Sequence, residues 1–70
     1  MVVTDMKSLG LAIRKRRKQL GYTQAYLTEF SGLSVSFISD IERGKETAEF
    51  GKVLYLVNLL GMDLEIRERQ

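Results

Sequence analysis

The stretch Thr23–Gly44, TQAYLTEFSGLSVSFISDIERG, contains start and stop signals for two short helices joined by a tight turn. Thr23 and Ser34 are good N-cap residues, and each follows an apolar residue that can pack one turn inside the helix. Gly32 can take the left-handed backbone conformation that ends a helix. Helices this short are unstable alone in water, so both must pack against the rest of the chain.

The second of these helices has a small polar outer face. Ile38 and Glu42 share one side of it, whereas Ser36, Asp40 and Arg43 share the other. A helix, a tight turn and a second helix with such a face is the helix-turn-helix arrangement, whose second helix enters the DNA major groove. An ordinary αα-corner with a solvated polar face has the same spacing, so spacing alone leaves both interpretations open.

The same residues resemble the Cro and phage-repressor type helix-turn-helix family. The resemblance rests on T-Q at the start of the first motif helix, G-L-S in the turn and F-I-S-D-I-E-R-G-K through the second helix. It extends from about Leu9 to Leu60 and implies a mainly α, four-helix domain of the lambda-repressor type. Within the family the chain is most similar to HipB-type antitoxins, because one helix and a short strand-like tail follow the motif. Thr28 departs from the alanine usual in the family, where the two motif helices approach closely.

Length and composition narrow the classes of function. The chain has 70 residues and contains neither cysteine nor histidine. A single domain of this size is near the lower limit for an adequate core, so we expect a partner or a second copy. The missing residue types exclude disulfides and remove the best zinc ligands and the usual catalytic base, so we expect no catalytic residue, metal or cofactor. The longest apolar run, 53–60, is interrupted by Asn58, and we expect a cytoplasmic protein without a membrane partner.

Periodicity predicts one domain over residues 1–70, with helices at about 6–20, 24–31, 35–43 and 48–60. We expect Thr47 to cap the last helix. The side chains expected to be buried in the first, second and last helices are Leu9, Ala12, Ile13, Leu20, Leu27, Phe30, Phe50, Val53, Leu54, Val57 and Leu60.

Two charged residues break this pattern, because Arg17 and Glu42 both fall on inward faces. A buried charge is costly unless it is paired, so we expect an ion pair between the first helix and the second motif helix, and the resemblance implies the same pair. Residues 1–20 hold six basic and one acidic side chain, although the whole chain has a net charge of only +2. This concentration indicates an electrostatic footprint for phosphate, and a solvated basic face is the alternative.

The resemblance also implies which side chains contact bases. They are Gln24, Ser34, Val35, Ser36 and Asp40. Val35 offers only apolar contact, for example with a thymine methyl group, whereas Ser36 can serve several base edges. Asp40 can accept only from the cytosine amino group and is repelled by phosphate, so solvent or a basic neighbour is its alternative. The alternative for Gln24 is that it is an ordinary residue of the first helical turn and makes no contact with DNA.

Phosphate contacts are expected at the helix starts and just beyond the second motif helix. Backbone amides at the caps Thr23 and Ser34 can bind anions, and Arg43 and Lys45 supply positive charge. No arginine or glutamine faces outward from the second motif helix to bind a base with two hydrogen bonds, so we expect modest discrimination in each half-site.

The tail changes to a period of two, which predicts a half-buried strand at about 62–68. The chain has no second candidate strand, so we expect this strand to pair antiparallel with that of a second copy, and a frayed tail is the alternative. The last helix is apolar on more than one side, and the side chains expected at the dimer interface are Leu56, Leu59, Met62, Leu64 and Ile66.

These patterns predict a homodimeric repressor that binds double-stranded DNA at a palindromic operator, with half-sites roughly 34 Å apart. The HipB resemblance implies, in addition, that the protein represses its own operon and holds a HipA-like serine/threonine kinase toxin inactive. A protein-interaction module with weak or lost DNA binding is the alternative, because Asp40 and a recognition face without basic residues are unfavourable for DNA. An enzyme is the least favoured class.

Overall fold

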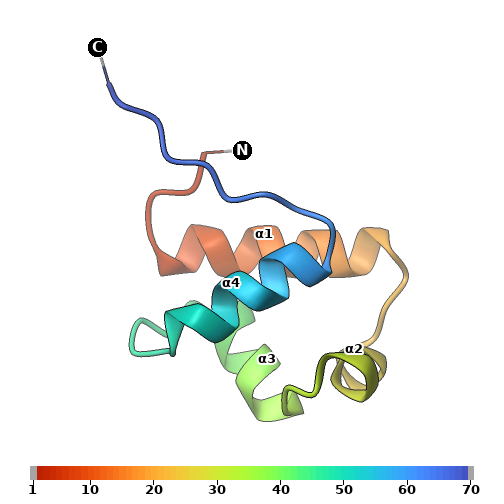
Figure 1. Ribbon diagram of the computed structural model, residues 1–70. Coiled ribbons are helices and arrows are strands. Elements are labelled where there is room, and N and C mark those ends of the chain that lie inside the picture. The colour runs from red at the N-terminus through yellow and green to blue at the C-terminus, as the bar shows by residue number, and fades with distance from the viewer. Residues whose placement is uncertain (1, 70) are drawn as a thin grey trace.

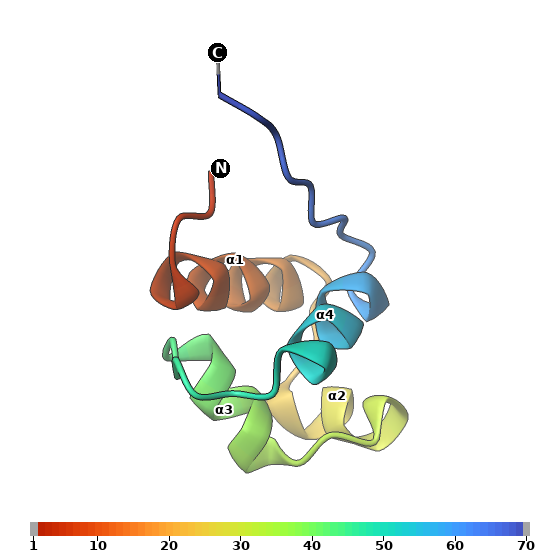
Figure 2. The same ribbon diagram turned by 60° about the vertical axis from the view of Figure 1, so that its left-hand side comes forward.

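Residues 2–69 are described by a computed structural model, and they form four helices around one core (Figure 1). The helices are α1 (Met6–Gln19), α2 (Gln24–Ser31), α3 (Val35–Glu42) and α4 (Phe50–Leu59). In Figure 2, α1 lies on one side of the molecule, α2 and α3 form the opposite side, and α4 closes the space between them. The mainly α, four-helix class predicted from the sequence is confirmed. None of the helices in this range is long and apolar enough to cross a membrane.

The two motif helices begin and end where the capping residues lie. The hydroxyl of Thr23 accepts a hydrogen bond from the Tyr26 amide at 3.0 Å, and that of Ser34 accepts one from the Phe37 amide at 3.0 Å. Gly32 ends α2 with a left-handed backbone (φ 75°), which costs glycine little because it has no Cβ. Only three residues therefore separate α2 from α3, and this short turn fixes their relative orientation.

The core is built from one face of each helix. The apolar residues that are buried are Leu9, Ile13, Leu27, Ile38, Ile41, Val53, Leu56, Val57 and Leu60. Fully burying a side chain of this size contributes roughly 1.5–3 kcal/mol relative to leaving it exposed. This shared core therefore stabilises helices that are individually too short to persist.

The first turn of α4 differs from the expectation. The helix begins at Phe50 rather than at 48, its N-cap is Glu49 rather than Thr47, and no side chain caps it. Its buried face is centred on Val53, Leu56, Val57 and Leu60, which places Phe50 at the exposed edge and leaves Leu54 only half-buried. Leu56 was expected at a dimer interface, and that prediction is wrong because its side chain has no exposed area and lies in the core of its own chain.

One further expectation is wrong, and another is not met within a single chain. Phe30 is 43% exposed instead of buried, and its ring packs against Tyr22 and Tyr26 with centroids 5.5 and 5.2 Å away. The C-terminal segment forms no strand within the single chain that the structure describes; 62–69 leave α4 as an extended chain (Figure 1). A strand needs a neighbouring strand for its backbone hydrogen bonds, and the described residues of one chain supply none, so pairing with a second copy stays a prediction.

The contact between α1 and α3 depends on a glycine. A Cβ added at Gly10 would lie 2.2 Å from the carbonyl oxygen of Ile41 and 3.0 Å from that of Glu42. The backbone of α1 therefore touches the last turn of α3 directly, and only glycine leaves room for this approach. The contact fixes α3 against α1 at the end opposite the α2–α3 turn.

Candidate nucleic-acid interface

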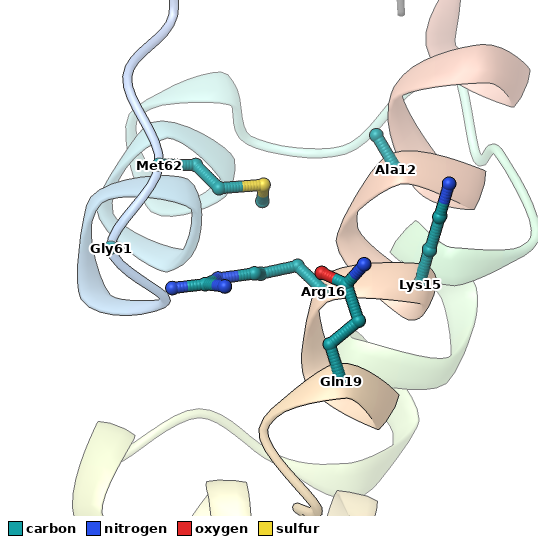
Figure 3. Close-up of a pocket in the computed structure, with 6 residues that line it drawn as sticks. All are labelled: Ala12, Lys15, Arg16, Gln19, Gly61 and Met62. Atoms are coloured by element: carbon teal, nitrogen blue, oxygen red, sulfur yellow. The ribbon is translucent and has the colours of Figure 1, made fainter.

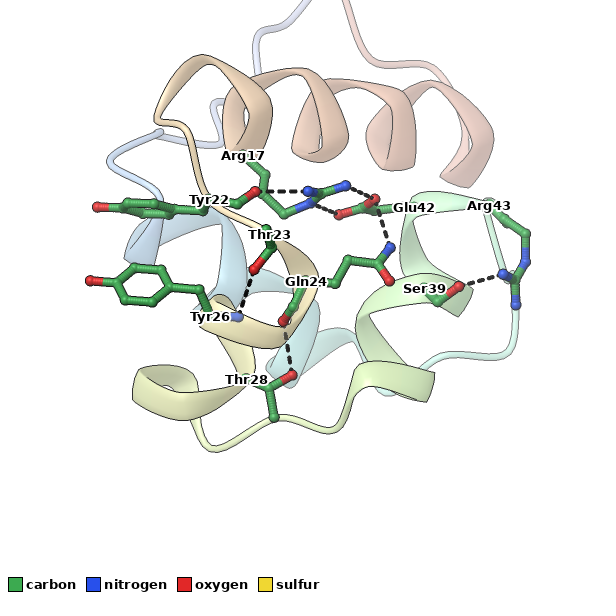
Figure 4. A network of polar contacts seen from close by, with 9 residues as sticks. All are labelled: Arg17, Tyr22, Thr23, Gln24, Tyr26, Thr28, Ser39, Glu42 and Arg43. Atoms are coloured by element: carbon green, nitrogen blue, oxygen red, sulfur yellow. Dashed lines mark hydrogen bonds and ion pairs between the residues drawn. The ribbon is translucent and has the colours of Figure 1, made fainter.

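A buried ion pair holds α3 in place from the inside (Figure 4). Arg17 donates from Nε to Oε2 of Glu42 at 2.6 Å and from Nη2 to Oε1 at 2.9 Å. The two side chains are only 9% and 3% exposed. The third guanidinium nitrogen, Nη1, donates to the carbonyl oxygen of Tyr22 at 2.8 Å, so the pair also fixes the chain that enters α2. The structure thus brings together the two charged residues that break the sequence pattern.

The hydrogen bonds that Arg17 donates to Glu42 raise the pKa of Arg17 above its ordinary value, although burial acts in the opposite direction. Every buried nitrogen and oxygen atom of the two side chains has a hydrogen-bond partner within the part of the chain that the structure describes. The pair is structural, since its atoms are closed to any ligand.

Gln24 lies between this pair and the outer surface. Its amide nitrogen donates to Oε1 of Glu42 at 3.1 Å, which holds the side chain at the start of α2 (Figure 4). The hydroxyl of Thr28 donates to the backbone carbonyl of Gln24 at 3.0 Å, so the threonine that departs from the family pattern has its polar atom satisfied within α2. One N–H of the Gln24 amide is therefore bound within the fold, and its amide oxygen can still accept a hydrogen bond.

The N-terminal end of α3 presents a small exposed surface. Ser34, Val35 and Ser36 are exposed, and the side chain of Val35 is 45% exposed. Ser34 is partly committed, because its hydroxyl caps the helix. The side chains here are short, so the backbone of α3 can approach a flat or grooved partner closely. A role of Val35 and Ser36 in base contact stays a prediction.

The C-terminal end of α3 carries a cluster of charges. The carboxylate of Asp40 lies 2.7 Å from Nη2 of Arg43 and 3.6 Å from Nζ of Lys45. Arg43 also donates to the hydroxyl of Ser39 (Figure 4). The structure therefore places Asp40 against basic neighbours, which was one of the two alternatives left open by the sequence. The two cations expected to contact phosphate already share one anion.

Two basic residues of α1 face away from α3. Lys15 and Lys18 are exposed and project from the side of α1 opposite Ile13 and Arg17, which face α3. Part of the positive charge in residues 1–20 therefore lies away from the outer face of α3, and a phosphate footprint on α1 stays a prediction.

Arg16 has a different role from its neighbours. Its Nε donates to the carbonyl oxygen of Leu60 at 2.8 Å, which satisfies an unpaired group at the C-terminus of α4. Figure 3 shows this arginine reaching across a shallow pocket between α1 and the start of the tail. The pocket has a volume of about 410 Å³, and the residues that line it are Ala12, Lys15, Arg16, Gln19, Gly61 and Met62.

Lys7 is a residue that sequence reasoning missed. A Cβ at Gly44, whose φ is +86°, would lie 2.8 Å from the Cα of Lys7, so the start of α1 touches the loop that follows α3. Lys7 is exposed there, and Arg43 and Lys45 are the chain neighbours of the glycine that it touches. The signal in the sequence was the glycine of the E-R-G terminus, which permits this contact.

The described residues show no cluster of acidic side chains arranged to hold a metal ion. The three aromatic rings of Tyr22, Tyr26 and Phe30 pack on one another along α2, and Figure 4 shows both tyrosine rings pointing away from Gln24 and α3. These rings therefore lie outside the surface formed by the start of α2 and the outer face of α3.

Comparison with known sequences gives one family. A sequence model of the family described as Helix-turn-helix matches residues 13–66. The chain is also 38% identical over 58 residues to an uncharacterized HTH-type transcriptional regulator, y4mF, from Sinorhizobium fredii (strain NBRC 101917 / NGR234). That alignment covers 83% of this chain and 76% of the relative.

Solved structures share the fold over the whole chain. They include a HipB–O4 20-mer complex, a complex of a serine-to-alanine HipB variant with an O2 20-mer, and a protein designated MDT, each with a TM-score of 0.87 and 100% of this chain covered. Their sequence identities are 18%, 20% and 18%, and 99%, 97% and 99% of their own chains are covered. At these identities the likeness establishes the fold.

Proposed function

We propose that this chain, which belongs to the helix-turn-helix family, is a transcriptional repressor that binds a palindromic DNA operator as a homodimer. The observation that carries the proposal is the exposed N-terminal end of α3, where Ser34, Val35 and Ser36 form a surface of short side chains. The buried pair of Arg17 and Glu42 fixes the opposite, C-terminal end of α3, and the short turn after α2 fixes the end that is exposed. A rigid helix with short side chains suits close approach to base edges in the major groove.

The roles of the base-reading residues follow from their chemistry. In this proposal Val35 packs against a thymine methyl group, and Ser36 forms a hydrogen bond with a base edge. Gln24 contributes its amide oxygen, because one of its two amide N–H groups is already bound to Glu42. Each half-site then discriminates modestly, and specificity comes from two half-sites in one operator.

Phosphates are held at both ends of the motif. The first turn of α2 offers backbone amides beside Thr23, although the hydroxyl of this cap is itself bound to the Tyr26 amide. Arg43 and Lys45 offer positive charge at the other end. Lys7, at the start of α1, lies beside Gly44, the residue between them. These contacts set the register of the helix on the duplex.

The dimer forms through the tail in this proposal. Ile66 is 95% exposed, and Leu64 is also exposed, which is unfavourable for apolar side chains in an isolated chain. Pairing residues 62–68 with the same segment of a second copy would satisfy their backbone groups and cover these side chains together with Leu59 and Met62. The half-sites would then lie about one helical turn, ~34 Å, apart.

A narrower role is part of the proposal. The resemblance of the motif to HipB-type antitoxins, together with the fold that this chain shares with HipB in two 20-mer complexes, supports an antitoxin-type regulator that represses its own operon. By the same resemblance, a HipA-like kinase toxin is its protein partner. Co-purification of a kinase with the tagged protein from its own cells would test this role.

The experiment that tests DNA binding compares two duplexes of equal length, the protein's own upstream sequence and a scrambled version, over a range of salt concentrations. We expect a dimer, measured by light scattering in the same buffer, that binds the upstream duplex more tightly. Ser36→Ala should reduce the preference, whereas Glu29→Ala, an exposed change on α2, should not. Equal binding to both duplexes with a steep salt dependence would mean that charge alone holds the DNA and would contradict the proposal.

A protein-interaction module is the second candidate. Two observations favour it: Asp40 neutralises part of the positive charge beside α3, and the aromatic side chains of Tyr26 and Phe30 are exposed on α2. If this candidate is correct, substitutions at Val35 and Ser36 will leave binding of the protein partner in cells intact. Substitutions in the tail will abolish that binding.

A further inference from the structure

The carboxylate of Asp40 bridges the two cations that follow α3. Its Oδ1 lies 2.7 Å from Nη2 of Arg43, and its Oδ2 lies 3.6 Å from Nζ of Lys45. The backbone adds to this arrangement, because the amides of Arg43 and Lys45 donate to the carbonyl oxygen of Asp40 at 3.2 and 3.0 Å. The turn after α3 thus keeps both cations within reach of one carboxylate.

The three side chains are accessible to solvent. The exposed fractions are 34% for Asp40, 68% for Arg43 and 51% for Lys45. Exposed ion pairs contribute little to stability, because water and salt screen the attraction between the charges. Asp40 is therefore not required to hold the fold, and another anion such as a phosphate can compete with it for the two cations.

The local charge seen by DNA is smaller than the sequence suggests. An approaching phosphate meets two cations and one anion at this end of α3, so a large part of its attraction is cancelled. The other acidic side chain of the helix, Glu42, is enclosed with Arg17 and is screened from this surface. Among the described acidic side chains of α3, Asp40 is thus the one that acts on the outer face.

We propose that Asp40 determines specificity by acting through Arg43 and Lys45: it weakens their sequence-independent attraction for the DNA backbone, so that binding depends more on the contacts of Val35 and Ser36. This inference rests on the proposed function and replaces a direct base contact for Asp40. The carboxylate faces two cations already, and a cytosine amino group would have to displace them. A positioning residue of this kind affects every duplex, whereas a base-reading residue affects only the duplex that carries its base.

The test is Asp40→Asn, which keeps the size of the side chain and removes its charge. We expect tighter binding to both the upstream and the scrambled duplex at low salt, with the larger gain for the scrambled one, so the ratio of the two affinities falls. The plot of log affinity against log salt should become steeper by about 0.9 for each additional phosphate that is neutralised. Unfolding curves of both proteins show whether the fold is unchanged.

A matched control removes the same charge elsewhere. Glu49→Gln takes away an exposed carboxylate that pairs with Lys52 at 3.3 Å, at the start of α4. It changes the net charge as much as Asp40→Asn does, so it measures the effect of total charge alone. We expect it to change binding to both duplexes much less.

Each other outcome overturns the inference in a recognisable way. If Asp40→Asn weakens binding to the upstream duplex alone, Asp40 reads a base. If Asp40→Asn leaves binding to both duplexes unchanged, Asp40 has no role in DNA binding. An equal gain from Glu49→Gln would assign the effect to net charge. A wild-type protein that binds neither duplex would remove the proposed function, and the inference with it, whereas selective wild-type binding with no effect of Asp40→Asn would remove the inference only.

Discussion

Two arginine–carboxylate pairs lie on opposite sides of α3. Arg17 and Glu42 meet at 2.6 Å on the inner side, and Arg43 and Asp40 meet at 2.7 Å on the outer side. Their lengths are nearly the same, but the inner side chains are 9% and 3% exposed and the outer ones 68% and 34%. Removing one partner of a buried pair leaves an unpaired charge in the interior, which costs several kcal/mol of stability. Removing one partner of an exposed pair costs little, because water solvates the charge that remains. Burial, rather than distance, therefore gives one pair a structural role and leaves the other free to exchange with a ligand.

The most direct way to break this comparison is to remove one carboxylate from each pair. Glu42→Gln leaves Arg17 buried without its counter-charge, so we expect a loss of about 3 kcal/mol in the free energy of unfolding. Asp40→Asn should cost less than about 1 kcal/mol, because its partner is solvated. Urea unfolding followed by circular dichroism measures both. Equal losses would mean that burial does not separate the two pairs.

The next effect tests whether the inner side of α3 is fixed by close packing as well as by charge. Gly10→Ala places a methyl group against the backbone of Ile41, so we expect a loss of about 1–3 kcal/mol from overpacking. Gly51→Ala is the control, since a Cβ there meets nothing within 4 Å and an alanine in a helix is favourable by roughly 0.5–1 kcal/mol. Thermal melting compares the two variants. A Gly10→Ala protein as stable as the wild type would show that α1 can move away from α3.

A smaller effect sharpens the contrast on the outer side. Arg43→Gln with Lys45→Gln removes two cations beside α3, and the salt slope of DNA binding should decrease by about 0.9 for each phosphate that is no longer neutralised. Lys15→Gln with Lys18→Gln removes the same charge from the far side of α1, where the cations face away from α3. We expect that control to leave the slope nearly unchanged. A larger effect from the α1 variant would move the DNA surface to α1.

The smallest effect concerns Asp5, an exposed carboxylate that caps α1 by accepting a hydrogen bond from the Ser8 amide at 2.8 Å. This backbone hydrogen bond lowers the pKa of Asp5 below its usual 3.8. The cap therefore stabilises α1 fully at pH values above 3.8. Its contribution to stability is lost as the pH falls through the lower pKa that Asp5 has in the folded state. Amide hydrogen exchange in the first turn of α1 should speed up on acidification, and Asp5→Asn should lose this dependence. Exchange rates in Asp5→Asn that respond to acid as the wild type does would assign the change to another group.

The sequence predicts structure well at positions where few residue types can meet a local requirement. Thr23 and Ser34 mark helix starts because few other residues satisfy the free amides there. Arg17 and Glu42 stand out because charges on inward faces require partners, and the structure brings these two together. Such signals are local or self-identifying, so they locate the motif without any knowledge of its packing.

The sequence is less informative where three-dimensional packing decides. Nothing in the spacing of α1 shows that Gly10 meets the backbone of α3, since that contact joins residues about 30 positions apart. Leu56 lies beside the stripe that begins at Phe50, but α4 rotates so that Leu56 is enclosed and Phe50 is not. The sequence gives the number of basic side chains in α1, but only the fold shows which of them project away from α3.

The extended tail has a consequence for how long the protein survives in a cell. Residues 62–69 are exposed or half-buried, and proteases bind their substrates as extended chains of this kind. In the proposed dimer joined through the tails this segment would be covered, so the rate of degradation would depend on the fraction of protein that is paired. Scarce protein would then be removed fastest, and the regulator would leave its proposed operator more sharply than dilution alone allows.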